Sequence, residues 1–299
     1  MDTNDKRITN GAFVYLGLLV AVFFFACPVY PTKTDVGLFQ WLSSTWNSET
    51  DFVHGWLVPV LFATFCVHAW RQMKKEELGS SKSGIALVAF GILCYLVSMR
   101  TMQPRIAFIG LPFLILGGAA YTSGWARAKH MIFASFFWYL AVPVPGFQQA
   151  TNILQLIVTK ACYYSGELLG MDIVLSGNEI YSATNSWDFD IAEGCSGIRS
   201  LMALVMIAAI YAYYSQNKWW KRAVLFSLAL PLSMLGNFVR VFSILVLAEW
   251  GFADFAAGVY HDFSGLLFFF PVALLGLYGA GYWLSGERKR RRVKTRVIS

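Results

Sequence analysis

Long apolar stretches separated by short polar segments dominate this chain. Apolar runs long enough to cross a bilayer lie near residues 11–30, 52–70, 84–100, 106–124, 131–146, 196–215, 223–247 and 264–284. A transmembrane helix needs roughly 20 mostly apolar residues, and each run comes close to that length. The pattern therefore predicts an all-α polytopic membrane protein with about eight transmembrane helices.

Two segments depart from this pattern. Residues 147–169 mix apolar positions with Lys160 and Glu167, which leaves open whether they lie at the membrane interface, re-enter the membrane or span it. Residues 171–194 are polar and rich in β-forming residues, which predicts a short extended or hairpin excursion. We expect residues 1–284 to form a single transmembrane domain, followed by a basic cytoplasmic tail over residues 285–299.

Composition favours a membrane over an aqueous environment. Apolar and aromatic residues make up 57% of the 299 residues and charged residues only 14%, and a soluble domain of this length cannot bury so much apolar surface. The net charge of +7 does not indicate nucleic acid, because seven of the 24 Lys and Arg residues follow the last apolar run. A basic cluster in that place favours anionic lipid, so we expect membrane lipids as partners and no nucleic acid.

The basic residues also predict an orientation. If the N-terminus is cytoplasmic and the chain crosses eight times, 18 of the Lys and Arg residues lie inside and 6 lie at or near the outer face. This bias follows the positive-inside rule and places both termini in the cytoplasm. A full crossing by residues 147–169 would move the basic tail outside, which the same rule opposes.

Polar motifs fall at the outer ends of the last three predicted spans. Cys195 opens span six beside Ser196, and the positive end of a helix favours the thiolate form of a thiol. Arg199 follows four residues later on the same helix face. Arg240 lies inside span seven, where a charged residue indicates function by default, and His261 precedes span eight. Cys195 is therefore a candidate nucleophile, and His261 a candidate acid, base or oxyanion stabiliser.

Two further polar residues on this face are candidates for supporting roles. Asn237 stands one turn before Arg240 and can partner it or bond a neighbouring helix. His54, at the outer start of span two, either serves the site or lines it. The candidates of the last three spans also fit structural roles. Cys195 can be a packed thiol, Arg240 can extend its charge to the headgroups, and His261 can be a solvated histidine. Since there is no CxxC or Cys/His spacing, we predict no metal site and no cofactor.

Together these motifs resemble the signatures of exosortases and archaeosortases. In the family's order, they are DFVHG at 51–55, AVPVP at 141–145, AEGCSGIRSL at 192–201, GNFVRV at 236–241 and the pair His261 with Gly265. The cysteine motif is specific, and the others are individually weak but strong in combination. The resemblance runs from about residue 46 to 284.

The resemblance implies a membrane-embedded cysteine protease or transpeptidase. Such enzymes cleave a C-terminal sorting signal of exported proteins, made of a short motif, a hydrophobic helix and a basic tail. Carried over, Cys195 forms an acyl-thioester, Arg240 acts as proton donor or charge partner, and His261 acts as acid, base or transition-state stabiliser. Arginine is too basic for efficient proton transfer near neutral pH, which favours an electrostatic role for Arg240.

The resemblance also implies a location and partners. A histidine in the third motif is typical of the bacterial branch, so we expect a multi-pass protein of the bacterial inner membrane whose active site faces the periplasm. Its partners would be exported proteins with C-terminal sorting signals and a cell-surface or lipid-linked acceptor. The recognised motif, the acceptor and the oligomeric state stay open.

Two other functions compete with this interpretation. A transporter needs polar groups along a path across the bilayer, whereas here they gather at one face. A non-catalytic scaffold for polysaccharide export is the second alternative.

Overall fold

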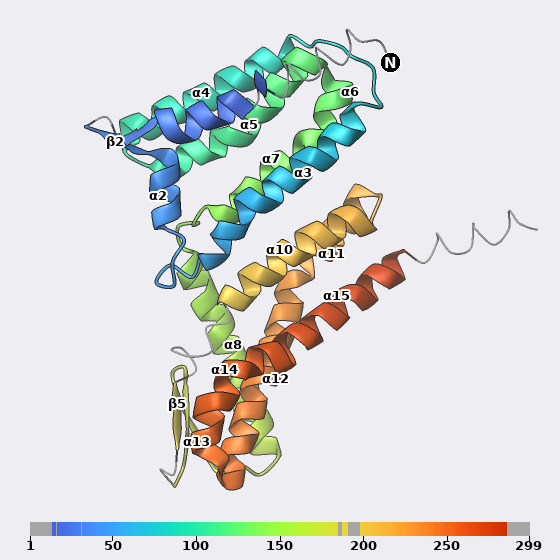
Figure 1. The fold of residues 1–299 in the computed structure, drawn as a ribbon. Helices are drawn as coiled ribbons and strands as arrows, with labels where there is room; N and C mark the ends of the chain where they lie inside the picture. The colour runs from blue at the N-terminus through green and yellow to red at the C-terminus, as the bar shows by residue number, and fades with distance from the viewer. Residues whose placement is uncertain (1–13, 16, 31, 185–186, 191–197, 286–299) are drawn as a thin grey trace, which may run out of the picture. The chain divides into compact units, whose positions relative to one another are not determined.

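The computed structural model describes residues 14–15, 17–30, 32–184, 187–190 and 198–285 (Figure 1). The chain folds as two compact units, Met1–Val144 and Pro145–Ser299. Helices dominate both, and each also contains a small antiparallel sheet.

The first unit is organised around a hairpin of two long helices, α4 (Ser83–Thr101) and α5 (Pro104–Ser123). Gly91 of α4 faces Gly110 of α5 so closely that a Cβ on either residue would lie within 3 Å of the other's carbonyl oxygen. Small residues permit such close backbone packing between membrane helices. The hairpin buries α5 far more than α4, so α5 is the central helix of this unit.

The remaining elements of the first unit surround α5. α7 packs against both α5 and α3, and β1 pairs with β2 as an antiparallel ladder. In chain order these elements are η1 (Val22–Ala26), β1 (Pro28–Tyr30), β2 (Lys33–Gly37), α2 (Leu38–Ser44), η2 (Val53–Trp56), α3 (Leu57–Met73), α6 (Trp125–Ala128), η3 (Lys129–Met131), α7 (Ile132–Phe137) and η4 (Trp138–Ala141).

The second unit begins with the helix α8 (Phe147–Leu168), which runs into a three-stranded antiparallel sheet. The strands are β3 (Ile173–Ser176), β4 (Glu179–Ser182) and β5 (Asp188–Asp190), paired in the order β3-β4-β5. The predicted excursion before the cysteine motif is thereby confirmed as a small sheet. Segment 147–169 is helical, and its relation to the membrane stays a prediction.

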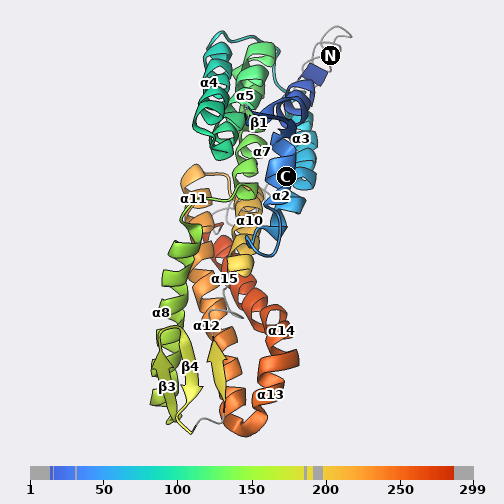
Figure 2. The same ribbon diagram turned by 90° about the vertical axis from the view of Figure 1, so that its left-hand side faces the viewer.

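A helical bundle completes the second unit. Its elements are α10 (Ile198–Ser215), α11 (Trp219–Ser227), α12 (Ala229–Leu247), η5 (Ala248–Phe252), α13 (Ala253–Phe255), η6 (Ala256–Tyr260), α14 (His261–Ser264), η7 (Gly265–Phe269) and α15 (Phe270–Leu284). Gly251 takes a positive φ of 87° where the chain reverses between α12 and α13. α12 contacts α8, α10, η7 and α15 and is the axis of the unit (Figure 2).

Two apolar cores lie along α12. We call the first the bundle core; it joins α10, α11, the start of α12 and α15 through Leu204, Ala208, Ala212, Leu225, Ala229, Phe269, Ala273, Leu277 and Leu284. We call the second the sheet core; it joins α8, the sheet, the end of α12, η5 and η6 through Val158, Cys162, Ile173, Ile180, Trp187, Val241, Ile244, Leu245, Ala248 and Ala256.

The described residues support a membrane protein but do not confirm eight spans. They contain four stretches long and apolar enough to cross, namely Val53–Met73, Ser83–Thr101, Pro104–Ser123 and Trp219–Leu284. The last of these is interrupted at Gly251 and Gly258, whose backbone angles are not helical. That last run contains two of the predicted spans. Gly17–Ala26 and Ser200–Ser215 are shorter apolar helices, and predicted span 131–146 is divided among η3, α7 and η4. The proposed boundary between residues 284 and 285 stays a prediction.

Candidate functional site

Arg240 lies on α12 between the bundle core and the sheet core. Its side chain is only 9% exposed, although it carries a charge. The guanidinium Nε donates to Ser264 Oγ at 2.8 Å, and Nη2 donates to the main-chain carbonyl of His261 at 3.4 Å. Buried charges need such hydrogen bonds to be tolerated, and α14 supplies two of those that Arg240 makes.

Ser264 links Arg240 to the His261 carbonyl in this cluster. Its hydroxyl donates to the His261 carbonyl at 2.7 Å while accepting from Arg240, and the residue is fully buried. Gly265 lies beside the same guanidinium, since a Cβ there would be 4.0 Å from Arg240 Cζ. The sequence motif included His261 and Gly265, but it assigned no role to Ser264. The spacing of three residues within a helix was the available signal, because a serine at that distance can bond the earlier carbonyl.

The imidazole of His261 is partly accessible. Its side chain is 24% exposed, and Nδ1 lies 3.6 Å from Oδ1 of the exposed Asp262. The structure therefore brings Arg240 and His261 together, as predicted, through the main-chain carbonyl of His261. A histidine that is partly exposed can exchange protons with solvent or with a bound substrate.

Asn237 and Gly236 precede Arg240 on α12. Asn237 is 5% exposed and lies one turn from Arg240, and its supporting role stays a prediction. Gly236 packs against η7, where a Cβ would lie 2.9 Å from the carbonyl oxygen of Phe269. The close approach of α12 to η7 at this glycine brings Arg240 within reach of Ser264.

The cysteine motif can be placed only in part. Cys195 and Ser196 lie outside the described residues, as do the side chains of Arg199 and of the acidic residues Asp188, Asp190 and Glu193. Helix α10 begins at Ile198, three residues after Cys195. The proposed roles of Cys195, Ser196 and Arg199 therefore stay predictions.

His54 has a defined structural partner in the first unit. Its Nε2 lies 2.9 Å from the carbonyl oxygen of Leu140. Two neighbouring carbonyls accept similar bonds, that of Ala141 from Trp46 Nε1 at 2.8 Å and that of Pro143 from Arg105 Nε at 2.9 Å. Three side chains thus hold the last turn of this unit. His54 belongs to that set, and sequence reasoning did not find Trp46 or Arg105 as its companions.

The glycine of the same motif is explained by packing. A Cβ on Gly55 would overlap the ring of Trp46, which is 3% exposed. Trp56 Nε1 in turn donates to the Trp46 carbonyl at 3.0 Å. The motif DFVHG therefore places His54 against the Leu140 carbonyl. Its glycine, Gly55, leaves room for Trp46 to reach the Ala141 carbonyl.

A family model described as transmembrane exosortase matches residues 46–279. The chain belongs to the transmembrane exosortase family. No curated protein and no solved structure gave a match. The matched range contains the buried Arg240 cluster and the His54 segment, so both lie within the part of the chain that defines an exosortase.

The exosortase also has a cavity of about 650 Å³ beside the sheet core. Three carboxylates line it, those of Asp172, Glu249 and Asp254, together with the rings of Trp187 and Phe252. None of its lining residues belongs to the Arg240 cluster. The cavity and the cluster are therefore separate features of the second unit.

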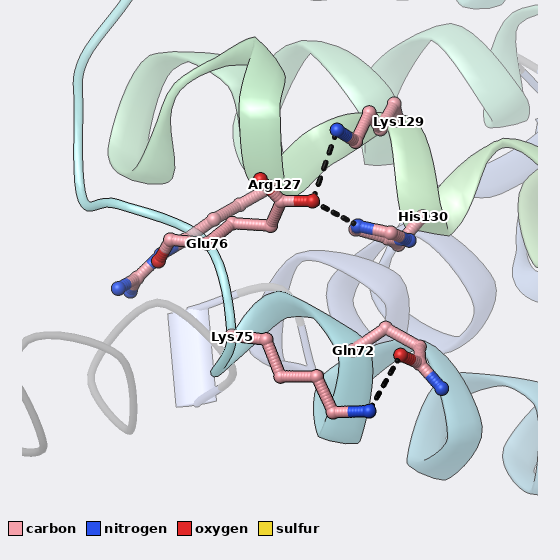
Figure 3. A network of polar contacts seen from close by, with 6 residues as sticks. All are labelled: Gln72, Lys75, Glu76, Arg127, Lys129 and His130. Atoms are coloured by element: carbon pink, nitrogen blue, oxygen red, sulfur yellow. Dashed lines mark hydrogen bonds and ion pairs between the residues drawn. The ribbon is translucent and has the colours of Figure 1, made fainter. Parts of the chain in front are cut away.

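A polar network ties the segment after α3 to α6 and η3 in the first unit (Figure 3). Glu76 Oε1 lies 3.0 Å from Lys129 Nζ and 3.1 Å from His130 Nε2, and Arg127 Nε donates to the Glu76 carbonyl at 3.0 Å. Lys129, and secondarily His130, hold the pKa of Glu76 below its ordinary value by bonding its ionised form. These contacts join the segment after α3 to α6 and η3 within the first unit.

Proposed function

We propose that this exosortase is a cysteine peptidase or transpeptidase that cleaves a C-terminal sorting signal at the outer membrane–water boundary. The observation that carries the proposal is Arg240, buried between two cores and hydrogen-bonded to the turn that begins with His261. A buried cation at that depth is costly. Stabilising the negative charge that develops in acyl transfer accounts for its presence.

The bundle supports a position near a membrane boundary. At the end away from Arg240, Lys221 Nζ donates to the Leu284 carbonyl at 2.6 Å, and Gln216 Nε2 donates to the Gly281 carbonyl at 3.0 Å. From Ser264 to Leu284 the chain is helical through η7 and α15, a rise of roughly 30 Å. This length is about the thickness of the hydrocarbon core. With the basic tail inside, Arg240 then lies at the outer boundary.

The proposed reaction uses the cysteine of the family motif. The Cys195 thiolate attacks the carbonyl carbon of the scissile peptide, a C–S bond forms, and the carbonyl oxygen becomes an oxyanion stabilised by Arg240. Collapse of the intermediate breaks the C–N bond, and protonated His261 gives its proton to the leaving amine. The exported protein is left as an acyl-thioester on Cys195.

A second nucleophile resolves the thioester. Water or an acceptor amine gives a proton to neutral His261 and attacks the thioester carbonyl, and the C–S bond breaks to return the thiolate. Water completes a hydrolysis, whereas an amine on a cell-surface or lipid-linked acceptor completes a transfer. The proposed substrates are exported proteins whose C-terminus carries a short motif, a hydrophobic helix and a basic tail.

The test is processing of a tagged substrate that carries such a signal. We expect both Cys195→Ala and Cys195→Ser to abolish the change in substrate size. The matched control is Cys162→Ala, which alters a buried thiol of the sheet core and should retain processing. Processing by Cys195→Ala at the rate of the parent protein would disprove the proposal.

A second experiment tests the orientation. An impermeant thiol reagent added to intact cells should label Cys195, with Cys195→Ser as the control, and a reporter fused after Ser299 should report from the cytoplasm. A reporter signal from the outside would contradict the proposed position of the site.

A further inference from the structure

Ser264 is the point at which α12 and α14 are joined beside the candidate site. We propose that Ser264 is a positioning residue, whose hydroxyl orients the Arg240 guanidinium toward the oxyanion of the reaction. This inference rests on the function proposed above. Ser264 acts through its hydrogen bond to Arg240 and does not itself contact the substrate in this proposal.

The hydrogen bonds around Ser264 fix the plane of the guanidinium. Nε and Nη2 point from the same edge of this planar group. That edge faces α14, with Nε 2.8 Å from Ser264 Oγ and Nη2 3.4 Å from the His261 carbonyl oxygen. Because the guanidinium is rigid, holding two donors on one edge directs the Nη1 donors away from α14.

A hydroxyl is suited to this position because it accepts and donates at once. Ser264 Oγ accepts from Arg240 and donates to the His261 carbonyl at 2.7 Å. The residue is fully buried, so bulk water does not replace a missing hydroxyl. Alanine at this position leaves Nε without its serine partner and the guanidinium held only at its remaining contacts.

The test compares two buried serines of the same bundle. Ser264→Ala removes the hydroxyl that bonds Arg240. The control Ser233→Ala removes the hydroxyl of a residue of α12 that is 6% exposed, and this hydroxyl donates to the Leu230 carbonyl of its own helix at 3.1 Å. We expect Ser264→Ala to lower kcat by about 10- to 100-fold, less than the roughly 10²- to 10³-fold that follows outright loss of one oxyanion donor, with KM within about twofold. Ser233→Ala should leave both parameters within about twofold.

A double-mutant cycle separates positioning from a general effect on folding. Arg240→Lys keeps the charge but lacks the planar edge that Ser264 holds. If Ser264 acts through Arg240, adding Ser264→Ala to Arg240→Lys should change kcat by less than about twofold. Multiplicative losses of kcat in the double variant would overturn the inference.

The controls distinguish failure of this inference from failure of the proposed function. If the parent and Ser233→Ala process the substrate and Ser264→Ala does so equally well, only the positioning role is wrong. If the parent processes no sorting-signal substrate, the proposed function is wrong and the positioning role is wrong with it. In that case the same cycle measured by thermal unfolding in detergent still reports whether Arg240 and Ser264 are coupled.

Discussion

Arg240 Nη2 donates to the main-chain carbonyl oxygen of His261 at 3.4 Å. The bond uses the backbone of residue 261, so it does not depend on the imidazole. Residue 261 thus has two separable parts, a carbonyl that helps to hold Arg240 and a partly exposed ring that is available for chemistry. This separation makes the role of the ring testable by itself.

We expect His261→Ala to abolish most activity without destabilising the protein. Loss of a general acid–base group typically lowers the rate by about 10²- to 10⁴-fold. A partly exposed side chain should change the free energy of unfolding by only about 0.5 kcal/mol. Processing rates and thermal unfolding measure the two effects, with Asp262→Asn as a control at an 80% exposed neighbour. Full activity in His261→Ala would remove the ring from the mechanism.

Gly236 should be intolerant of a methyl group. A Cβ would lie 2.9 Å from the Phe269 carbonyl oxygen, a backbone atom that cannot turn aside. Gly236→Ala is therefore expected to destabilise the protein by about 1–3 kcal/mol and to lower activity by shifting α12, and with it Arg240. Gly279→Ala on α15 is the control, because nothing lies within 4 Å of a Cβ there. Equal melting temperatures for the two variants would contradict the packing described for Gly236.

Gly55 should be equally sensitive in the first unit. A Cβ there overlaps the Trp46 ring, whose Nε1 bonds the Ala141 carbonyl. We expect Gly55→Ala to lower stability by about 1–3 kcal/mol and to increase proteolytic cleavage near residues 141–146. Gly17→Ala, with open space around its Cβ, is the comparison. An unchanged cleavage pattern in Gly55→Ala would show that Trp46 does not need this space.

Glu76 should give the first unit an acid-sensitive contact. Its folded-state pKa is lowered by Lys129 and then by His130, so the ionised carboxylate stabilises the fold at pH values above its ordinary pKa. That stabilisation is lost as the pH falls through the lowered folded-state pKa. The melting temperature of the parent should therefore fall more steeply in acid than that of Glu76→Gln. Parallel pH profiles for the two proteins would refute this role of Glu76.

Hydropathy predicted the positions of α3, α4, α5, α12 and α15, because each is a long apolar run with polar ends. It did not predict the division of 131–146 into η3, α7 and η4. An apolar run looks the same whether it spans a bilayer as one helix or is buried in shorter pieces.

The candidate site was also predictable only in part. The predicted spans and their orientation placed Arg240 and His261 at the same face, and the structure shows that their segments are in contact. The three-residue spacing could indicate only the local bond from Ser264 to the His261 carbonyl. Its bond with Arg240 was not predictable, because it depends on a tertiary contact between α12 and α14. The same holds for Trp46 and Arg105, which meet carbonyls far away in sequence.

The two polar ends of the bundle bear on the thickness of bilayer that would match it. Lys221 is tied to Leu284 at one end and Arg240 to Ser264 at the other, so the apolar length between them is set by hydrogen bonds and does not stretch. A bilayer of much longer or shorter lipid chains creates a hydrophobic mismatch that such a bundle meets by tilting or by deforming the lipid. If the bundle spans the membrane as proposed, lipid chain length becomes a variable that moves Arg240 relative to the headgroups without any change in sequence.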